Sequence, residues 1–162
     1  MKISKYSEME HLAKKADEGC ILAITGPDIY QSAQLQYLMV EKFGSELKYD
    51  IIRLEGSELQ KGDLRRYILE NSLFAPGKLL IISKCHNIGQ SAQSELMSFI
   101  DEGLNDCALL LVSLKTPRDS TILRKLEKRI PYYICYEPFE REMPGWATRI
   151  ASSENIKLST ET

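Results

Sequence analysis

Short apolar runs recur along this chain, and each is separated from the next by a stretch with helical periodicity. A run of this length, bounded by turn residues, is typical of a strand that is buried on both faces. Strands that alternate with helices indicate βαβ crossovers and a parallel sheet covered on both sides. Because such crossovers are right-handed, the pattern predicts a doubly wound α/β fold. The five expected strands lie at residues 21–25, 49–54, 79–83, 108–113 and 132–135.

The stretches between these runs have the apolar spacing of amphipathic helices. Asp28 is a suitable N-cap for the second helix, and Gly44 is a suitable residue to end it. We expect one domain over residues 1–154, with residues 155–162 as a polar tail or the start of a further domain. The expected helices lie at residues 5–18, 28–43, 63–71, 91–102, 120–129 and 140–153.

The composition is that of an ordinary soluble protein, with 43% hydrophobic and 27% charged residues in a chain of 162. The net charge of -2 excludes a global basic field that would attract nucleic acid or acidic lipid. Basic residues gather only locally, and Arg118, Lys125 and Arg129 belong to this group. No apolar stretch approaches the roughly 20 residues of a membrane helix, and the first residues lack the apolar core of a signal peptide. We therefore expect a cytoplasmic protein without a membrane partner.

The cysteines and histidines do not form a recognisable chemical site. There is no Cys-x-x-Cys pair, and each cysteine lies in or beside an expected strand, where a reduced thiol behaves as a small buried hydrophobe. Cys85 and His86 are adjacent, so on an extended segment they point to opposite faces and cannot act as a nucleophile and base. His11 and His86 are far apart, without the clustered ligands that a metal ion needs. The four cysteines are Cys20, Cys85, Cys107 and Cys135.

The loop after the first expected strand reads Gly26-Pro27-Asp28 and lacks the chemistry of a phosphate-binding loop. Such a loop needs several glycine amides to wrap the phosphates, a lysine to neutralise them, and Ser or Thr to hold magnesium. Here proline offers no amide, and an acidic residue stands where phosphate would approach. Lys84 follows the strand at 79–83, instead of the acidic residues that position magnesium and water. We expect no catalytic residue, cofactor or metal, and an active nucleotide hydrolase with an unorthodox loop is the alternative.

The stretch Ser72-Leu73-Phe74-Ala75 joins a charged helix to a buried strand and is unusually apolar for a connecting turn. Turns run over the surface, where their backbone meets water. Leu73 and Phe74 could fold back under the turn as a hydrophobic lid. They could instead form an exposed anchor for a pocket on a partner, as aromatic hot spots do.

Four stretches, in this order and spacing, resemble the N-terminal domain of the delta subunit of bacterial DNA polymerase III, a clamp-loader subunit. They are residues 24–30, 52–59, 72–82 and 144–146. The resemblance covers residues 21–150 and leaves residues 1–20 unassigned. It implies a RecA-like AAA+ module with a degenerate P-loop and without ATP hydrolysis. It also implies that the five strands stand in the spatial order five, one, four, three, two.

The same resemblance implies a function. Ser72, Leu73 and Phe74 would bind the sliding clamp, the ring that tethers the polymerase to DNA, and would help to open it. Other clamp-loader subunits would be partners, with DNA contacted indirectly through the assembly. The alternatives are the nucleotide hydrolase named above and an unrelated doubly wound regulatory domain, in which Leu73 and Phe74 belong to the core. If they are the anchor, both side chains are exposed in the free domain.

Overall fold

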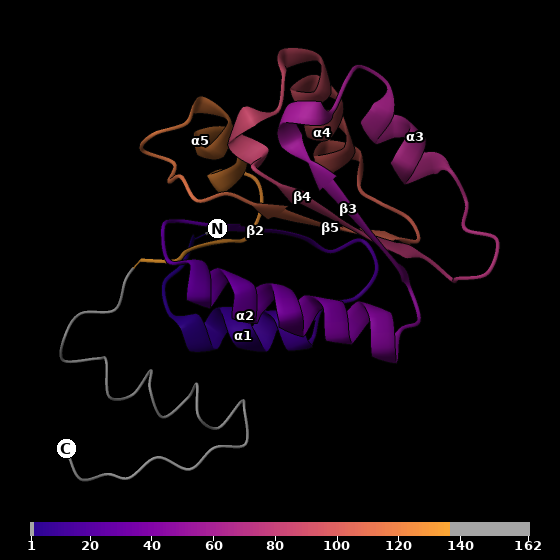
Figure 1. Cartoon of the computed structure of the whole chain (residues 1–162), viewed down its shortest axis with the longest axis horizontal. Helices are drawn as coiled ribbons and strands as arrows, with labels where there is room; N and C mark the ends of the chain where they lie inside the picture. The colour runs from indigo at the N-terminus through magenta and orange to yellow at the C-terminus, as the bar shows by residue number, and fades with distance from the viewer. Residues whose placement is uncertain (1, 137–162) are drawn as a thin grey trace, which may run out of the picture.

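The computed structural model describes residues 2–136, which form one parallel sheet with helices on both faces (Figure 1). Six strands stand in the order β1-β6-β2-β5-β4-β3, and every neighbouring pair is parallel. The helix expected at 140–153 and the tail at 155–162 lie outside the described residues. The strands are β1 (Lys2–Ile3), β2 (Ile21–Thr25), β3 (Asp50–Glu55), β4 (Lys78–Ser83), β5 (Cys107–Val112) and β6 (Tyr132–Ile134).

The doubly wound α/β prediction is confirmed, but the prediction of five strands is wrong. β2 to β6 lie at the five expected places, and their order is the expected one. The additional strand, β1, extends the sheet beyond β6, with Lys2 paired to Tyr132 and Ile3 to Tyr133. Two residues are too few to show an alternation in the sequence. Lys2 and Ile3 form a strand because they pair with the edge of β6. The sequence pattern alone therefore could not reveal β1.

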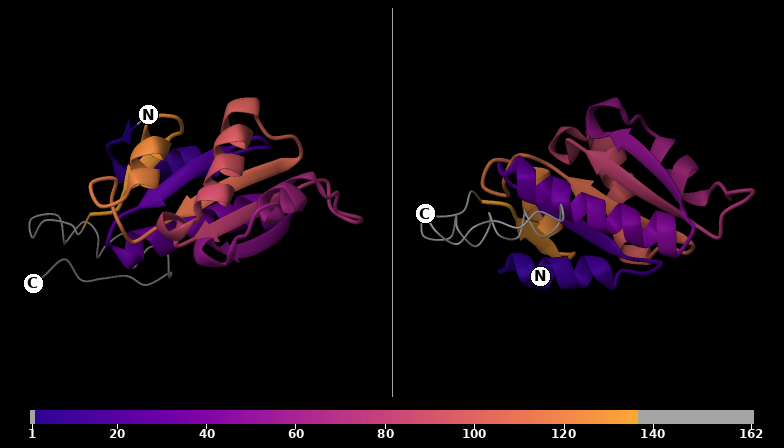
Figure 2. Two further views of the ribbon diagram at one scale, coloured as in Figure 1. Left: turned by 90° about the horizontal axis from the view of Figure 1, so that it is seen from above. Right: turned by 60° about the horizontal axis from the view of Figure 1, so that its bottom comes forward.

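Helices cover the sheet in two layers (Figures 1 and 2). One face carries α1 and α2, and a core of buried residues from these helices packs against that side. The other face carries α3, α4 and α5 over a second core. The helices are α1 (Tyr6–Lys14), α2 (Ile29–Val40), α3 (Asp63–Leu69), α4 (Gln90–Glu102) and α5 (Thr121–Glu127), with short helical turns η1 (Glu41–Glu46), η2 (Gly56–Glu58) and η3 (Cys85–Asn87).

The second helix begins as predicted but does not end as predicted. The Asp28 side chain accepts a hydrogen bond from the amide of Tyr30, as an N-cap does. Beyond α2 the chain continues as the π-helical turn η1 through Gly44, which therefore does not stop it. The left-handed residue that ends this segment is Lys48, with a φ of 61°. Three other helices are shorter than expected, because α1 ends at Lys14, α3 at Leu69 and α5 at Glu127.

The cysteines are core residues, as the sequence predicted. Cys85, Cys107 and Cys135 are buried and Cys20 is half-buried, and all four are free thiols. Burial raises the pKa of Cys85 to about 12 and that of Cys107 to about 11. Such thiols stay protonated near neutral pH and are poor nucleophiles.

Candidate functional site

Leu73 and Phe74 stand in solvent on a loop that projects from the body of the domain between α3 and β4 (Figures 1 and 2). Their exposed fractions are 90% and 98%. The prediction of exposure is confirmed, and the hydrophobic-lid interpretation is wrong. Leu69, the last residue of α3, is also 58% exposed. We call Leu73 and Phe74 the apolar tip.

Ser72 fixes the start of the loop through its hydroxyl group. Its Oγ donates a hydrogen bond to Oδ2 of Asp50 at 2.6 Å. The same oxygen accepts a hydrogen bond from the amide of Ala75 at 3.2 Å. The first bond ties the loop to the beginning of β3, and the second closes the turn that carries the apolar tip. Ser72 thus positions the tip and need not contact a partner itself.

Lys78 fixes the helix that precedes the loop. Its side chain is buried, and its ammonium group donates hydrogen bonds to the carbonyl oxygens of Tyr67 and Glu70. These carbonyls belong to the end of α3, where backbone acceptors lack helical partners and a positive charge is favoured by the helix dipole. The hydrogen bonds offset the cost of burying the charge. Lys78 therefore connects the end of α3 to the start of β4.

Gly77 allows the end of the loop to pack closely against Tyr49 and the backbone of Asp106. A Cβ atom at this position would lie 2.7 Å from the carbonyl oxygen of Asp106 and 2.7 Å from two ring atoms of Tyr49. The carbonyl of Gly77 accepts from the amide of Asp50 at 3.0 Å. The amide of Lys78 donates to the carbonyl of Asp106 at 3.1 Å. The end of the loop is thus bonded to segments on both sides of β4.

The other end of α3 is held by α4. The carboxylate of Glu95 accepts hydrogen bonds from the amides of Gly62 and Arg65, the latter at 3.3 Å. Leu64 and Ile68 bury the inner face of the helix. Because both ends and the inner face are fixed, α3 is a firm support for the apolar tip. A pre-ordered anchor loses less conformational entropy on binding than a flexible one.

The loop after β2 is closed by the chain itself. Gly26, with a φ of 106°, donates its amide to the carbonyl of Lys115 at 2.9 Å. The amide of Asp28 donates to the carbonyl of Cys135 at 3.0 Å, and that of Tyr30 to the Asp28 carboxylate at 3.0 Å. Pro27 lies between them and has no amide. The amides of Gly26, Asp28 and Tyr30 therefore already donate hydrogen bonds within the chain.

A side-chain network reinforces this closure. Gln31 is 2% exposed, and its Nε2 donates to the Asp28 carboxylate at 2.7 Å and to the carbonyl of Tyr136 at 2.6 Å. Its Oε1 accepts from the hydroxyl of Tyr133 at 2.7 Å. The network ties the beginning of α2 to β6 and to the residues that follow it.

Two polar pairs lie at the carboxyl ends of the neighbouring strands. Lys84, which follows β4, forms an ion pair with Glu55 at 2.6 Å, and this pair lowers the pKa of the Glu55 carboxyl. The Oγ of Ser113 lies 2.7 Å from Nδ1 of His86. Desolvation by burial, followed by the charges of the nearby lysines, lowers the pKa of His86, so the neutral imidazole is favoured. Because Ser113 is only 2% exposed, it is not an accessible nucleophile.

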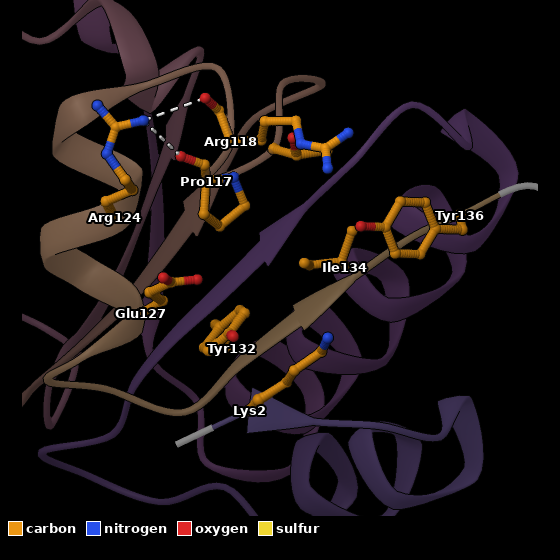
Figure 3. A pocket seen from close by; sticks show the side chains of 9 residues that line it. Lys2, Pro117, Arg118, Arg124, Glu127, Tyr132, Ile134 and Tyr136 are labelled. Atoms are coloured by element: carbon orange, nitrogen blue, oxygen red, sulfur yellow. Dashed lines mark hydrogen bonds between the residues drawn. The ribbon is translucent and has the colours of Figure 1, made fainter.

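The basic residues named from the sequence do not form one surface. Arg129 is paired with Asp101 at 2.8 Å, and Lys125 is exposed on α5. Arg118 instead lies on the loop before α5 and lines a hollow that also includes Lys2 (Figure 3). Their separation could not be seen from spacing alone.

Sequence reasoning named Ser72, Leu73 and Phe74 but missed the residues that hold them. Asp50 and Lys78 lie at strand starts, where no local pattern distinguishes a partner of the loop from an ordinary surface residue. Leu69 offered a weak signal, because it precedes Leu73 by four residues on the same segment.

Between residues 2 and 136, no group of three or more His, Cys, Asp or Glu side chains is placed to hold a metal ion. Over the same residues, the helices are too short or too polar to cross a bilayer.

No protein-family model and no curated protein matches the sequence. Solved structures do match. The DNA clamp loader delta protein of Bacillus subtilis is 13% identical with a TM-score of 0.70, over 97% of this chain and 50% of that one. The RuvB Holliday junction branch migration motor of Thermotoga maritima is 20% identical with a TM-score of 0.57, over 95% and 50%. A DNA polymerase III gamma subunit-related protein from Thermotoga maritima is 13% identical with a TM-score of 0.56, over 91% and 52%.

The chain thus spans about half the length of these solved structures. At these identities the likeness concerns the fold. It shows that the described residues share the fold of these structures, a parallel sheet with helices on both faces.

Proposed function

We propose that this chain is a clamp-loader module that binds the sliding clamp through Leu73 and Phe74 and does not hydrolyse ATP. The observation that carries the proposal is the exposed apolar tip on a firmly held base. Exposed aromatic and aliphatic side chains of this kind are the anchors that fill pockets on protein partners. The fold shared with a clamp loader delta protein supports the choice of partner.

The proposed mechanism is mechanical. A sliding clamp is a closed ring, and one of its interfaces must open to admit DNA. A protein that binds the ring more tightly in the open state shifts the population toward that state by its differential affinity. Leu73 and Phe74 supply the binding energy, while Ser72, Lys78 and Gly77 set the direction from which the tip approaches.

The closed loop at Gly26 supports the absence of ATP hydrolysis. An ATP phosphate would need backbone amides that already donate to Lys115, Cys135 and the Asp28 side chain. Opening this loop would break those bonds and bring phosphate toward the Asp28 carboxylate. We therefore assign ATP use to other subunits of the assembly, with which this chain associates. The assembly as a whole acts on DNA, and the protein works in the cytoplasm.

The test replaces both anchor residues, Leu73→Ala with Phe74→Ala, and measures binding to the sliding clamp encoded in the same genome. Loss of a central aromatic anchor costs about 2–4 kcal/mol, so we expect affinity to fall about a hundredfold or more. Exposed side chains leave no cavity when truncated, so the melting temperature should remain nearly unchanged. Surface plasmon resonance and circular dichroism supply the two measurements.

The matched control is Ile29→Ala with Tyr37→Ala, which also removes one exposed aliphatic and one exposed aromatic side chain, here from α2. It should bind the clamp as the unmodified chain does. Undiminished binding by the Leu73 and Phe74 variant would sink the proposal. Failure of the unmodified chain to bind any clamp would favour the unrelated regulatory domain.

A further inference from the structure

A hollow of about 250 Å³ lies at the edge of the sheet, away from the apolar tip (Figure 3). Its floor is β6 with Tyr136, one wall is α5 with the loop before it, and the other wall is β1. Lys2 and Arg118 stand on opposite sides of it, although 116 positions separate them in the sequence. The added strand β1 is what brings Lys2 to this place, because it pairs Lys2 with Tyr132.

The floor is aromatic and apolar. Side chains of a strand alternate between its two faces, so Tyr132 and Ile134 share one side of β6, while Tyr133 faces the core under α1 and α2. Tyr136, which lies two residues beyond the strand, also lines the hollow. Tyr132 is buried, Ile134 is half-buried, and Tyr136 is 58% exposed. An exposed tyrosine ring beside a hollow offers a surface on which a planar group can stack.

The charges around the hollow are not balanced. Among the described residues, no acidic side chain forms an ion pair with Lys2 or Arg118, and both are exposed. Glu127 is the acidic residue of the lining, and it is engaged by Tyr132. Figure 3 shows Lys2 on one side of the hollow and Arg118 on the other, with Tyr132 and Ile134 between them. An anion placed between Lys2 and Arg118 would meet two cations that form no ion pair with any acidic side chain of residues 2–136.

The wall that carries Arg118 is ordered before any ligand arrives. The guanidinium of Arg124 donates to the carbonyl oxygens of Pro117 at 3.2 Å and Arg118 at 3.1 Å (Figure 3). It also donates to the Thr121 hydroxyl at 3.1 Å. Arg124 therefore holds the backbone of the loop in place. The side chain of Arg118, on the same loop, lines the hollow.

We propose that this hollow binds one nucleotide of a single-stranded nucleic acid, with its phosphate between Lys2 and Arg118 and its base on Tyr136. Cations that hold the backbone, next to an aromatic side chain that stacks a base, are the elements of single-strand binding. A hollow of about 250 Å³ is too small for a double helix, so the proposal concerns an unpaired nucleotide. An acidic peptide would use the two cations but would leave the tyrosine ring without a planar partner.

The experiment measures binding of a fluorescein-labelled oligothymidylate of about 12 nucleotides to the full chain by anisotropy. One phosphate neutralised on a single strand predicts a log–log salt slope of about −0.7. Lys2→Ala with Arg118→Ala should reduce that slope to near zero and weaken binding at low salt at least fivefold. Tyr136→Leu should weaken binding about fivefold and leave the slope unchanged.

The matched control is Lys125→Ala with Lys128→Ala, which removes two exposed positive charges outside the hollow, one on α5 and one at its C-cap. It should bind the oligonucleotide within a factor of about two of the unmodified chain, because its charges touch no phosphate. The Leu73 and Phe74 variant should bind like the unmodified chain, so this test is independent of clamp binding. Equal losses in the two charge variants, or no binding at low salt, would overturn the proposal. Equally tight binding of an oligoglutamate would overturn it too, and would identify an acidic peptide as the occupant.

Discussion

At the scale of single residues, Gly77 and Lys78 decide where the apolar tip stands. Gly77 lacks the Cβ atom that would meet Tyr49 and the Asp106 carbonyl, and Lys78 turns its charge inward to end α3. Neither residue contacts a partner in our proposal. Both fix the geometry from which Leu73 and Phe74 reach outward.

Gly77→Ala is expected to destabilise the domain by about 1–3 kcal/mol, the usual cost of forcing an extra group into a packed site. The reason is crowding, because three atoms would lie 2.7 Å from the new Cβ, one of them backbone. Urea denaturation measures the free energy of unfolding. Gly44→Ala is the control, since its Cβ would meet only Ile51 side-chain atoms at 3.6 Å and 3.7 Å, an ordinary contact. Equal stability of the two variants would contradict the packing described for Gly77.

Residue-scale features were only partly predictable from the sequence. The exposure of Leu73 and Phe74 was one of two open interpretations, because an apolar pair in a turn has the same pattern whether it folds inward or outward. The hydrogen bonds from Ser72 to Asp50 and from Lys78 to the end of α3 depend on how distant segments meet. No local sequence pattern predicts these contacts between distant segments.

At the scale of elements, α3 is a short helix that depends on its neighbours. Seven residues are too few to be stable alone, so tertiary contacts must hold the helix. Glu95 supplies them at the N-terminal end and Lys78 at the C-terminal end. The positions of the helices between residues 2 and 136, and of five strands, followed from periodicity. β1 and the π-helical turn η1 did not, because pairing with β6 and packing after Val40 determine them.

Glu95→Ala should loosen α3 and weaken both stability and clamp binding. Loss of a helix cap typically costs about 0.5–2 kcal/mol, and a mobile α3 must be ordered again when the tip binds. Denaturation midpoints and clamp affinity are the measurements. The control is Glu102→Ala, which changes an exposed residue at the end of α4, the helix that also carries Glu95. It should alter neither the denaturation midpoint nor the clamp affinity. If the Glu95 variant melts and binds like the unmodified chain, the capping role is wrong.

At the scale of the whole molecule, the loop after β2 has its backbone donors bonded within the chain, and the apolar tip lies beyond the C-terminal end of α3. The strand order places the Gly26 loop at the carboxyl edge, between the segments that follow β5 and β6. In open parallel sheets this edge is where ligands bind. Here Lys115 and Cys135 supply the carbonyls that occupy it, so the fold is retained while its usual ligand position is filled.

Millimolar ATP with magnesium should therefore leave the melting temperature of the full chain unchanged. A ligand present at a hundred times its dissociation constant adds about 2.7 kcal/mol to the stability of the folded state. In a domain of this size that corresponds to a rise of roughly 5–10 °C. Binding at the Gly26 loop would first have to break the bonds to Lys115 and Cys135, and it would then place phosphate beside the Asp28 carboxylate. Differential scanning fluorimetry with ATP, ADP and buffer alone makes the measurement. A rise of several degrees with ATP that Asp28→Asn increases further would show that this loop does bind nucleotide, and the hydrolase alternative would replace our assignment of ATP use to other subunits.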